Sequence, residues 1–139
     1  MQQQIQLDTQ PQVQFDEQQT TADSALSLVN NLYQCVDAKD VTALAAFLSD
    51  DVRFRIGNFD MLQGKADVLA ANAEFFSSIT SMTHQIDSIW VQEKDVICHG
   101  QVNYVRLDQT THAVPFATIL QLQQGKISNY LVFVDLSQL

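Results

Sequence analysis

Apolar residues recur with helical spacing through much of the chain between residues 21 and 79. From 21 to 38, intervals of three and four predict a helix whose buried face contains Ala25, Leu28, Val29, Leu32, Cys35 and Val36. Asp40 is a suitable N-cap for a second, short helix after a break at Ala38–Lys39. A third helix is predicted from about 65 to 79, and its inner face includes one polar residue, Asn72.

Alternation of apolar and polar residues dominates the remaining segments. Residues 52–56 alternate with period two, which predicts a strand with Phe54 and Ile56 on the core side. After Ser81, short polar turns separate four longer predicted strands, at 83–92, 96–107, 113–123 and 126–135. Helices followed by a strand meander are typical of an α+β fold in which the helices pack on one face of an antiparallel sheet.

The first twenty residues have a different composition. They are rich in glutamine and offer little apolar surface to offset the entropy of ordering, so we predict a mobile tail over 1–20 and a single domain over 21–139. A weak alternation of Ile5, Leu7, Val13 and Phe15 leaves open that the tail docks on a partner subunit.

The charge of the chain argues against two classes of partner. A formal net charge of −9, with seven Lys and Arg residues, repels phosphate backbones and anionic lipids, so we expect neither nucleic-acid nor membrane binding. No apolar run approaches the roughly 20 residues that span a bilayer. The N-terminus lacks the basic and apolar regions of a secretory signal, so a cytoplasmic location is expected. Cys35 and Cys98 are interpreted as reduced, packed thiols.

The alternation in the strands predicts a pocket on the inner face of the sheet. The strand at 96–107 is expected to direct His99, Gln101 and Asn103 inward. Mainly apolar side chains from the other elements would complete a small-molecule site: Phe54, Ile56, Asn72, Phe76, Phe116, Thr118, Tyr130 and Val132.

His99 is the one inward candidate expected to titrate near neutral pH, and it is the tentative catalytic residue. It could serve as a general base or anchor a ligand carbonyl, or it could be a hydrogen-bonded core histidine. His84 and His112 lie on other predicted strands. No histidine pair has metal-ligand spacing with a carboxylate, and no phosphate loop or nucleophile elbow is present, so neither a metal nor another cofactor is expected.

The order of these elements resembles the nuclear transport factor 2-like superfamily, in its SnoaL-like branch of small bacterial proteins. The resemblance covers about residues 21–139. It rests on five short segments in this order: Ala38 to Asp40, Leu48 to Val52, Leu62 to Lys65, Tyr104 to Asp108, and Gly125 to Asp135. The resemblance implies a cone-shaped, strongly bent antiparallel sheet packed on three N-terminal helices, with an internal apolar pocket. It also implies a homodimer formed through the outer face of the sheet.

The same resemblance allows the family's catalytic positions to be compared with this sequence. The general base of ketosteroid isomerases corresponds to Ile56, and their tyrosine corresponds to Leu32, next to Tyr33. The acid–base aspartate of the cyclases corresponds to Thr118. The Asp–Arg–Asp set of the epoxide hydrolases corresponds to uncharged residues, namely Asn103, Gln101 and Val132. This loss of charge argues against all three mechanisms. Asp135 is interpreted as a structural cap.

Three functions remain open, because the fold alone does not determine chemistry. The first is a binding protein for an apolar or amphipathic small molecule. The second is an isomerase, cyclase or hydrolase that uses His99 with neutral polar pocket residues. The third is an interaction protein whose pocket is filled by its own side chains. A homodimer is expected, because the predicted outer face is largely apolar: Cys98, Val102, Tyr104, Ala117, Ile119, Leu131 and Phe133.

Overall fold

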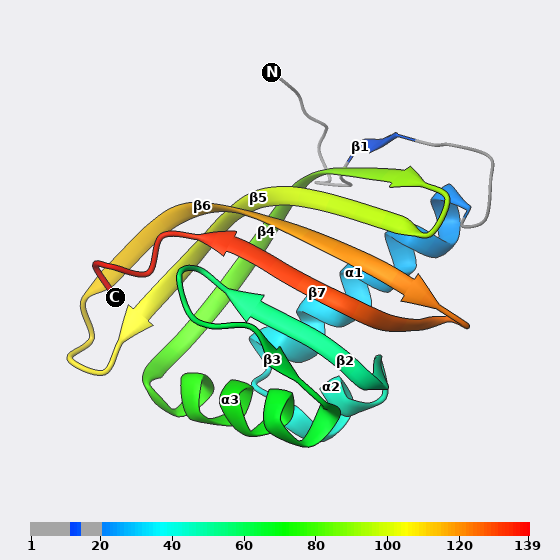
Figure 1. Cartoon of the computed structure of the whole chain (residues 1–139). Coiled ribbons are helices and arrows are strands. Elements are labelled where there is room, and N and C mark those ends of the chain that lie inside the picture. The colour runs from blue at the N-terminus through cyan, green and yellow to red at the C-terminus, as the bar shows by residue number, and fades with distance from the viewer. Residues whose placement is uncertain (1–11, 15–20) are drawn as a thin grey trace.

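A strongly bent seven-stranded sheet packs on three helices (Figure 1). The computed structural model describes residues 12–14 and 21–139. The predicted mobile tail therefore lies outside the described residues, except for a short strand, β1 (Gln12–Gln14). Within the described residues, no helix is both long and apolar enough to cross a membrane. The α+β class and the three helices predicted from the sequence are confirmed.

Local capping explains where the helices begin. The Thr21 side chain caps α1 (Ala22–Asp37) by accepting the Ser24 N–H, and Asp40 caps α2 (Val41–Ala45) by accepting the Ala43 N–H at 3.0 Å. The third helix, α3 (Lys65–Ser77), follows Gly64, whose φ of 99° suits glycine. These starts agree with the sequence prediction.

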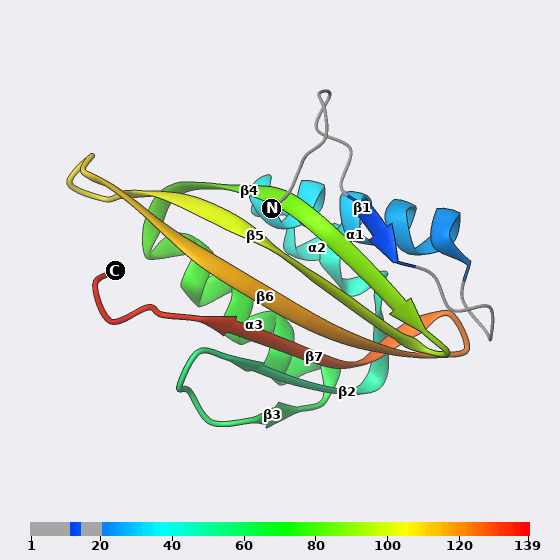
Figure 2. The same cartoon turned by 90° about the horizontal axis from the view of Figure 1, so that it is seen from above.

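The sheet has the order β1-β4-β5-β6-β7-β2-β3. Its remaining strands are β2 (Leu48–Ile56), β3 (Leu62–Gln63), β4 (Ile79–Gln92), β5 (Asp95–Arg106), β6 (Thr111–Gln123) and β7 (Lys126–Val134). The predicted four-strand meander is β4 to β7, all antiparallel, while β2 joins β7 in parallel and β1 joins β4 in parallel. The view from above shows the long strands crossing over the helices (Figure 2). The inner face of the sheet is therefore the face that the helices cover.

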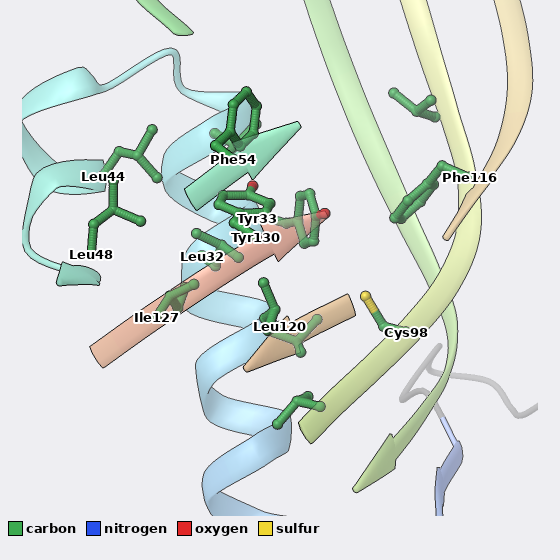
Figure 3. Packing of buried hydrophobic residues seen from close by; sticks show 14 of the residues in the cluster. Leu32, Tyr33, Leu44, Leu48, Phe54, Cys98, Phe116, Leu120, Ile127 and Tyr130 are labelled. Atoms are coloured by element: carbon green, nitrogen blue, oxygen red, sulfur yellow. The ribbon is translucent and has the colours of Figure 1, made fainter. Parts of the chain in front are cut away.

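The core lies between α1, α2 and this inner face. Leu32, Leu44 and Leu48 are fully or almost fully buried and lie near Leu120 and Ile127 of the sheet (Figure 3). Burial of each such side chain contributes about 1.5–3 kcal/mol of transfer free energy, which holds the helices against the strands.

At Gly100 the backbone of β4 approaches β5 so closely that there is no room for a side chain. A Cβ atom built on Gly100 would lie 1.8 Å from the Gln85 carbonyl oxygen, and the β4–β5 register shifts between Ile86 and Ser88. Bulges and strand glycines are the usual means by which a sheet bends sharply. The bend of the cone therefore depends in part on this glycine.

The face assigned to β5 from the sequence is wrong. Cys98, Val102 and Tyr104, which were predicted on the outer face, are buried on the inner one. His99, Gln101 and Asn103 alternate with them and face outward. The prediction placed Ile97 and Val105 inward with these polar residues, but the opposite set of residues is the more apolar one. The polar residues at 99, 101 and 103 were the available signal of an outer face, because alternate polar side chains mark the solvated side of a strand.

Candidate functional site

A small cavity lies between α1, α3 and the inner face of the sheet. Its volume is about 30 Å³, room for about one water molecule. Its walls are mainly aromatic and aliphatic side chains: Tyr33, Val36, Phe54, Ile56, Asn72, Phe75, Phe76, Met82, His84, Val102, Tyr104, Phe116, Tyr130, Val132 and Val134. Among the lining residues, His84 is the one histidine.

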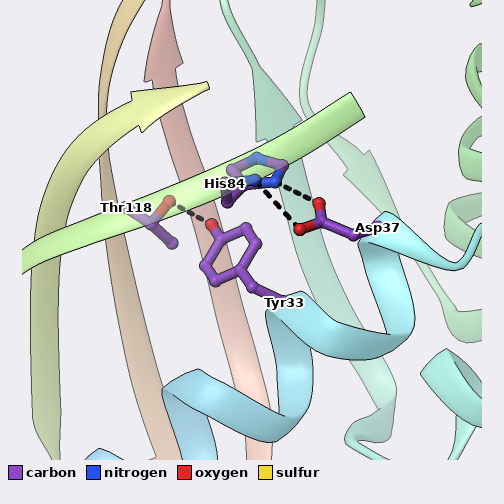
Figure 4. Close-up of polar contacts among 4 residues, drawn as sticks. All are labelled: Tyr33, Asp37, His84 and Thr118. Carbon is purple, nitrogen blue, oxygen red and sulfur yellow. Dashed lines mark hydrogen bonds and ion pairs between the residues drawn. The ribbon is translucent and has the colours of Figure 1, made fainter. Parts of the chain in front are cut away.

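The last residue of α1 holds His84 in place. Asp37 Oδ1 lies 2.6 Å from His84 Nδ1, and Asp37 Oδ2 accepts the His84 backbone N–H at 2.9 Å (Figure 4). An ionised carboxylate only accepts hydrogen bonds, so Nδ1 carries the proton in this contact. Among the described residues, Nε2 has no hydrogen-bond partner, and the ring lines the cavity. The pair therefore leaves Nε2 unbonded on a ring that lines the cavity.

Aromatic rings surround the His84 imidazole. The Tyr33 ring centroid lies 4.4 Å away at a tilt of 36°, and the Phe116 ring makes an edge contact at 5.0 Å. The His84 side chain is 7% exposed and that of Asp37 is 24% exposed. The carboxylate thus retains contact with solvent while the imidazole faces an apolar space.

Two buried phenols supply hydrogen-bond donors near this imidazole. The Tyr33 hydroxyl lies 2.5 Å from the hydroxyl of Thr118, which is fully buried. Burial raises the pKa of Tyr33 well above its usual value of 10, and the neighbouring Tyr130 raises it further. Burial is also the main cause that raises the pKa of Tyr130. Both phenols therefore stay protonated at neutral pH and can donate hydrogen bonds.

A larger groove adjoins the cavity between α3 and the segment that contains β3. Its volume is about 460 Å³. The cavity and the groove share four wall residues: Phe54, Ile56, Asn72 and Phe75. The Asn72 amide donates to Val68 O at 2.9 Å, which fixes the side chain at this boundary. A ligand in the groove would thus reach His84 only past these four side chains.

The structure brings most of the predicted site residues together. The cavity is lined by seven of them: Phe54, Ile56, Asn72, Phe76, Phe116, Tyr130 and Val132. Thr118 is buried behind the cavity, where it contacts Tyr33. Whether any of these residues binds a ligand remains a prediction.

His99, Gln101 and Asn103 lie on the opposite face of the sheet, so the prediction that they point into the pocket is wrong. The His99 ring stacks on Trp90 at 5.3 Å and 16°. The residues that the prediction missed are Asp37, His84 and Tyr104. His84 alternates with Met82 and Ile86 in β4, and this apolar alternation was a usable sign that the histidine faces the core.

A metal centre has no candidate ligand set in the part of the chain that the structure describes. No group of three or more His, Cys, Asp or Glu side chains is close enough to hold an ion there. The arrangement around His84 is instead suited to moving a proton: a base, a carboxylate that orients it, and neutral donors in an apolar space.

The sequence matches a known protein family over most of its length. Residues 29–130 match the SnoaL-like domain. No curated protein matches the sequence.

Solved structures share the fold at low sequence identity. A candidate SnoaL-like polyketide cyclase from Jannaschia sp. superposes with a TM-score of 0.71 at 16% identity, over 81% of this chain and 85% of that one. An NTF2-like protein of unknown function from Burkholderia pseudomallei gives 0.74 at 15%, over 82% and 92%. An LEH-like epoxide hydrolase from Mycobacterium tuberculosis gives a TM-score of 0.69 at 14% identity, over 80% of this chain and 82% of that one. At these identities the likeness establishes the fold alone.

Proposed function

The chain belongs to the SnoaL-like domain family, and we propose that its inner cavity catalyses proton transfer on a small, mainly apolar carbonyl compound. The observation that carries this proposal is the Asp37–His84 pair, whose imidazole lines an apolar cavity. This proposal keeps the acid–base enzyme considered from the sequence and replaces His99 by His84.

The proposed reaction begins at a carbon next to the carbonyl group. His84 Nε2 takes a proton from that carbon, the electron pair of the C–H bond forms the enolate, and negative charge develops on the carbonyl oxygen. Asp37 stabilises the imidazolium that results. Tyr33 and Tyr130, whose phenols stay protonated because burial raises the pKa of each, are the donors for the enolate oxygen.

The fate of the enolate determines the type of reaction. Return of the proton to a different carbon gives an isomerisation, whereas attack of the enolate carbon on a second carbonyl gives a cyclisation. The cavity itself has room for about one water, so most of the substrate would occupy the adjoining groove. Its reactive end would displace side chains at the shared wall.

A binding protein without turnover is the second candidate. Apart from His84, the cavity lining is apolar or neutral, which is also the composition of a passive small-molecule pocket. In that case the Asp37–His84 pair would only satisfy a buried imidazole.

Hydrogen–deuterium exchange separates the two candidates without knowledge of the natural substrate. The probe is β-tetralone, an apolar ketone with acidic α-protons, incubated in D₂O and followed by proton NMR. We expect the wild-type protein to accelerate exchange over buffer. We expect His84→Gln to lower that acceleration by about 10²–10⁴-fold, the range for loss of a general base. Binding of the ketone by the wild type without faster exchange would favour the binding protein.

We also propose that the chain forms a homodimer through the outer face of the sheet. Trp90, Ile97, Ile119 and Leu131 occupy one row across four neighbouring strands. Trp90 is 36% exposed, and the nearby Phe133 is 47% exposed. An apolar row of this kind is costly to leave in water.

Sedimentation of the wild type and of Ile119→Lys tests the dimer. We expect a dimer for the wild type at micromolar concentration and a folded monomer for the variant. A wild-type monomer would refute the proposal.

A further inference from the structure

The groove beside the cavity differs from the cavity in its charge. Among the described residues, two ionisable side chains line it, the carboxylates Asp60 and Glu74, and no Lys, Arg or His of this part of the chain contributes to its walls. The chain as a whole carries a net charge of −9, which adds to the negative potential at this opening. An anionic ligand would be repelled there, and a cation would be attracted.

Aromatic rings form much of the remaining wall. Phe54, Phe59 and Phe75 line the groove, and Phe59 is 63% exposed although it is a large apolar side chain. The face of an aromatic ring attracts an organic cation, and the attraction is strongest when carboxylates lie nearby and water is partly excluded. A hydrophobic groove for a neutral ligand would not require two carboxylates at its edge.

Asn72 provides a polar group at the inner end of the groove. Its side chain is 8% exposed, and its amide nitrogen donates to Val68 O. Within the described part of the chain, its carbonyl oxygen has no hydrogen-bond partner, and the residue lines both the groove and the cavity. This oxygen is available to a donor group on a ligand that spans the boundary.

We propose that the groove binds the ammonium end of an organic cation with an apolar body. Asp60 and Glu74 supply the charge, the three phenylalanines supply the aromatic walls, and Asn72 accepts a hydrogen bond from the inner part of the ligand. The inference deepens the proposed function, on which it rests for the position of the reactive end. It makes the substrate class an amine-bearing or quaternary ammonium compound rather than any apolar ketone.

Three probes of similar shape and different charge test the proposal by amide NMR titration. The first is choline. The second is the neutral alcohol in which a carbon atom replaces the choline nitrogen, so that it ends in a tert-butyl group. The third is a carboxylate with the same tert-butyl group. We expect choline to shift the amide resonances of Ala71 and Ser78, which line the groove. We also expect choline to bind about tenfold more tightly than the alcohol, which is the combined effect on affinity expected from cation–ring contacts and exposed charge contacts. The carboxylate should bind more weakly than either.

Variants of the groove then identify the source of the preference. Glu74→Gln and Asp60→Asn should each lower the affinity for choline by about two- to fivefold and leave the affinity for the alcohol unchanged. Phe59→Leu should lower choline affinity by a similar factor while retaining apolar area. Asp87→Asn is the matched control, because it removes an exposed carboxylate that does not line the groove, and it should have no effect.

Several results would overturn the proposal. These are equal affinity for choline and the alcohol, tighter binding of the carboxylate, no shift of the groove amides at millimolar choline, or equal effects of Glu74→Gln and Asp87→Asn. Since this titration measures only binding, its failure would leave the ketone exchange result intact. Failure of the exchange assay would likewise leave the charge preference of the groove measurable.

Discussion

His84 and His99 lie on neighbouring strands of one sheet and have opposite surroundings. His84 faces inward, bonded to Asp37 and enclosed by Tyr33 and Phe116. His99 faces outward and stacks on Trp90. The residue type is the same, so the difference comes from the face of the sheet and from the partner that α1 brings to it. A histidine becomes a candidate base only where packing presents its free nitrogen to a cavity.

The same contrast applies to the two faces as a whole. The inner face carries Tyr104 and Tyr130, α1 contributes Tyr33, and all three tyrosines of the chain are buried. The outer face carries exposed amides such as Gln101 and Asn103 beside a row of apolar side chains. We therefore expect substitutions on the inner face to change the stability of the fold and the titration of its tyrosines. We expect substitutions on the outer face to change the association of two chains.

The largest expected effect on stability is at Gly100, where the inner face bends. Gly100→Ala places a methyl group where the Gln85 carbonyl oxygen approaches to 1.8 Å, so β4 must move. Such overpacking should lower the free energy of unfolding by about 3 kcal/mol. The neighbouring Gln101→Ala, on the outer face, should change it by less than about 0.5 kcal/mol. Urea denaturation measures both, and equal values would contradict the assigned faces.

A smaller effect is expected from the buried hydroxyl pair. Thr118→Val keeps the shape of the side chain but removes the partner of the Tyr33 hydroxyl. An unsatisfied buried hydroxyl costs about 1–3 kcal/mol. Thr83→Val makes the same change at an exposed position of β4 and should cost less than about 0.5 kcal/mol. If thermal unfolding shows no difference between the two variants, the hydrogen bond does not stabilise the fold.

The pH dependence of stability should also come from the inner face. Burial raises the pKa of Tyr104 from 10.0 to about 12, and the pKa values of Tyr33 and Tyr130 are raised as well. Above pH 10 the unfolded chain releases phenolic protons that the folded chain retains, so the free energy of unfolding decreases as the pH rises. The contribution is fully present below pH 10 and is lost as the pH passes through the folded-state values.

Ultraviolet titration of the phenolate band checks this expectation. The folded protein should show almost no phenolate at pH 10, and phenolate should appear together with unfolding at higher pH. Half-ionised tyrosines at pH 10 in a folded sample would contradict their burial.

Much of the fold could be predicted from local patterns. Thr21 and Asp40 mark helix starts. The alternation in the last two strands predicted the correct inner residues on β6 and β7. The face of β5 is the exception, because its polar residues at 99, 101 and 103 mark the outer side and the prediction assigned them to the inner one. Because alternate residues of a strand share a face, this one error placed His99 on the wrong side of the sheet.

The Asp37–His84 contact was beyond reach of the sequence for a different reason. The two residues are 47 positions apart, and only the packing of α1 against β4 brings them together. The shared wall between the cavity and the groove likewise depends on how α3 sits against β2, which no local pattern specifies. Conversely, most of the apolar lining was predictable, since it requires only the alternation of each strand.

The comparison of His84→Gln with His99→Gln in the ketone exchange assay tests the central claim most directly. Both variants replace an imidazole by an amide on the same sheet, and sedimentation of each sample controls for a change in association. The account predicts loss of the accelerated exchange in His84→Gln and wild-type exchange in His99→Gln. Retained exchange in His84→Gln, with loss in His99→Gln, would contradict the account and move the reactive site to the outer face.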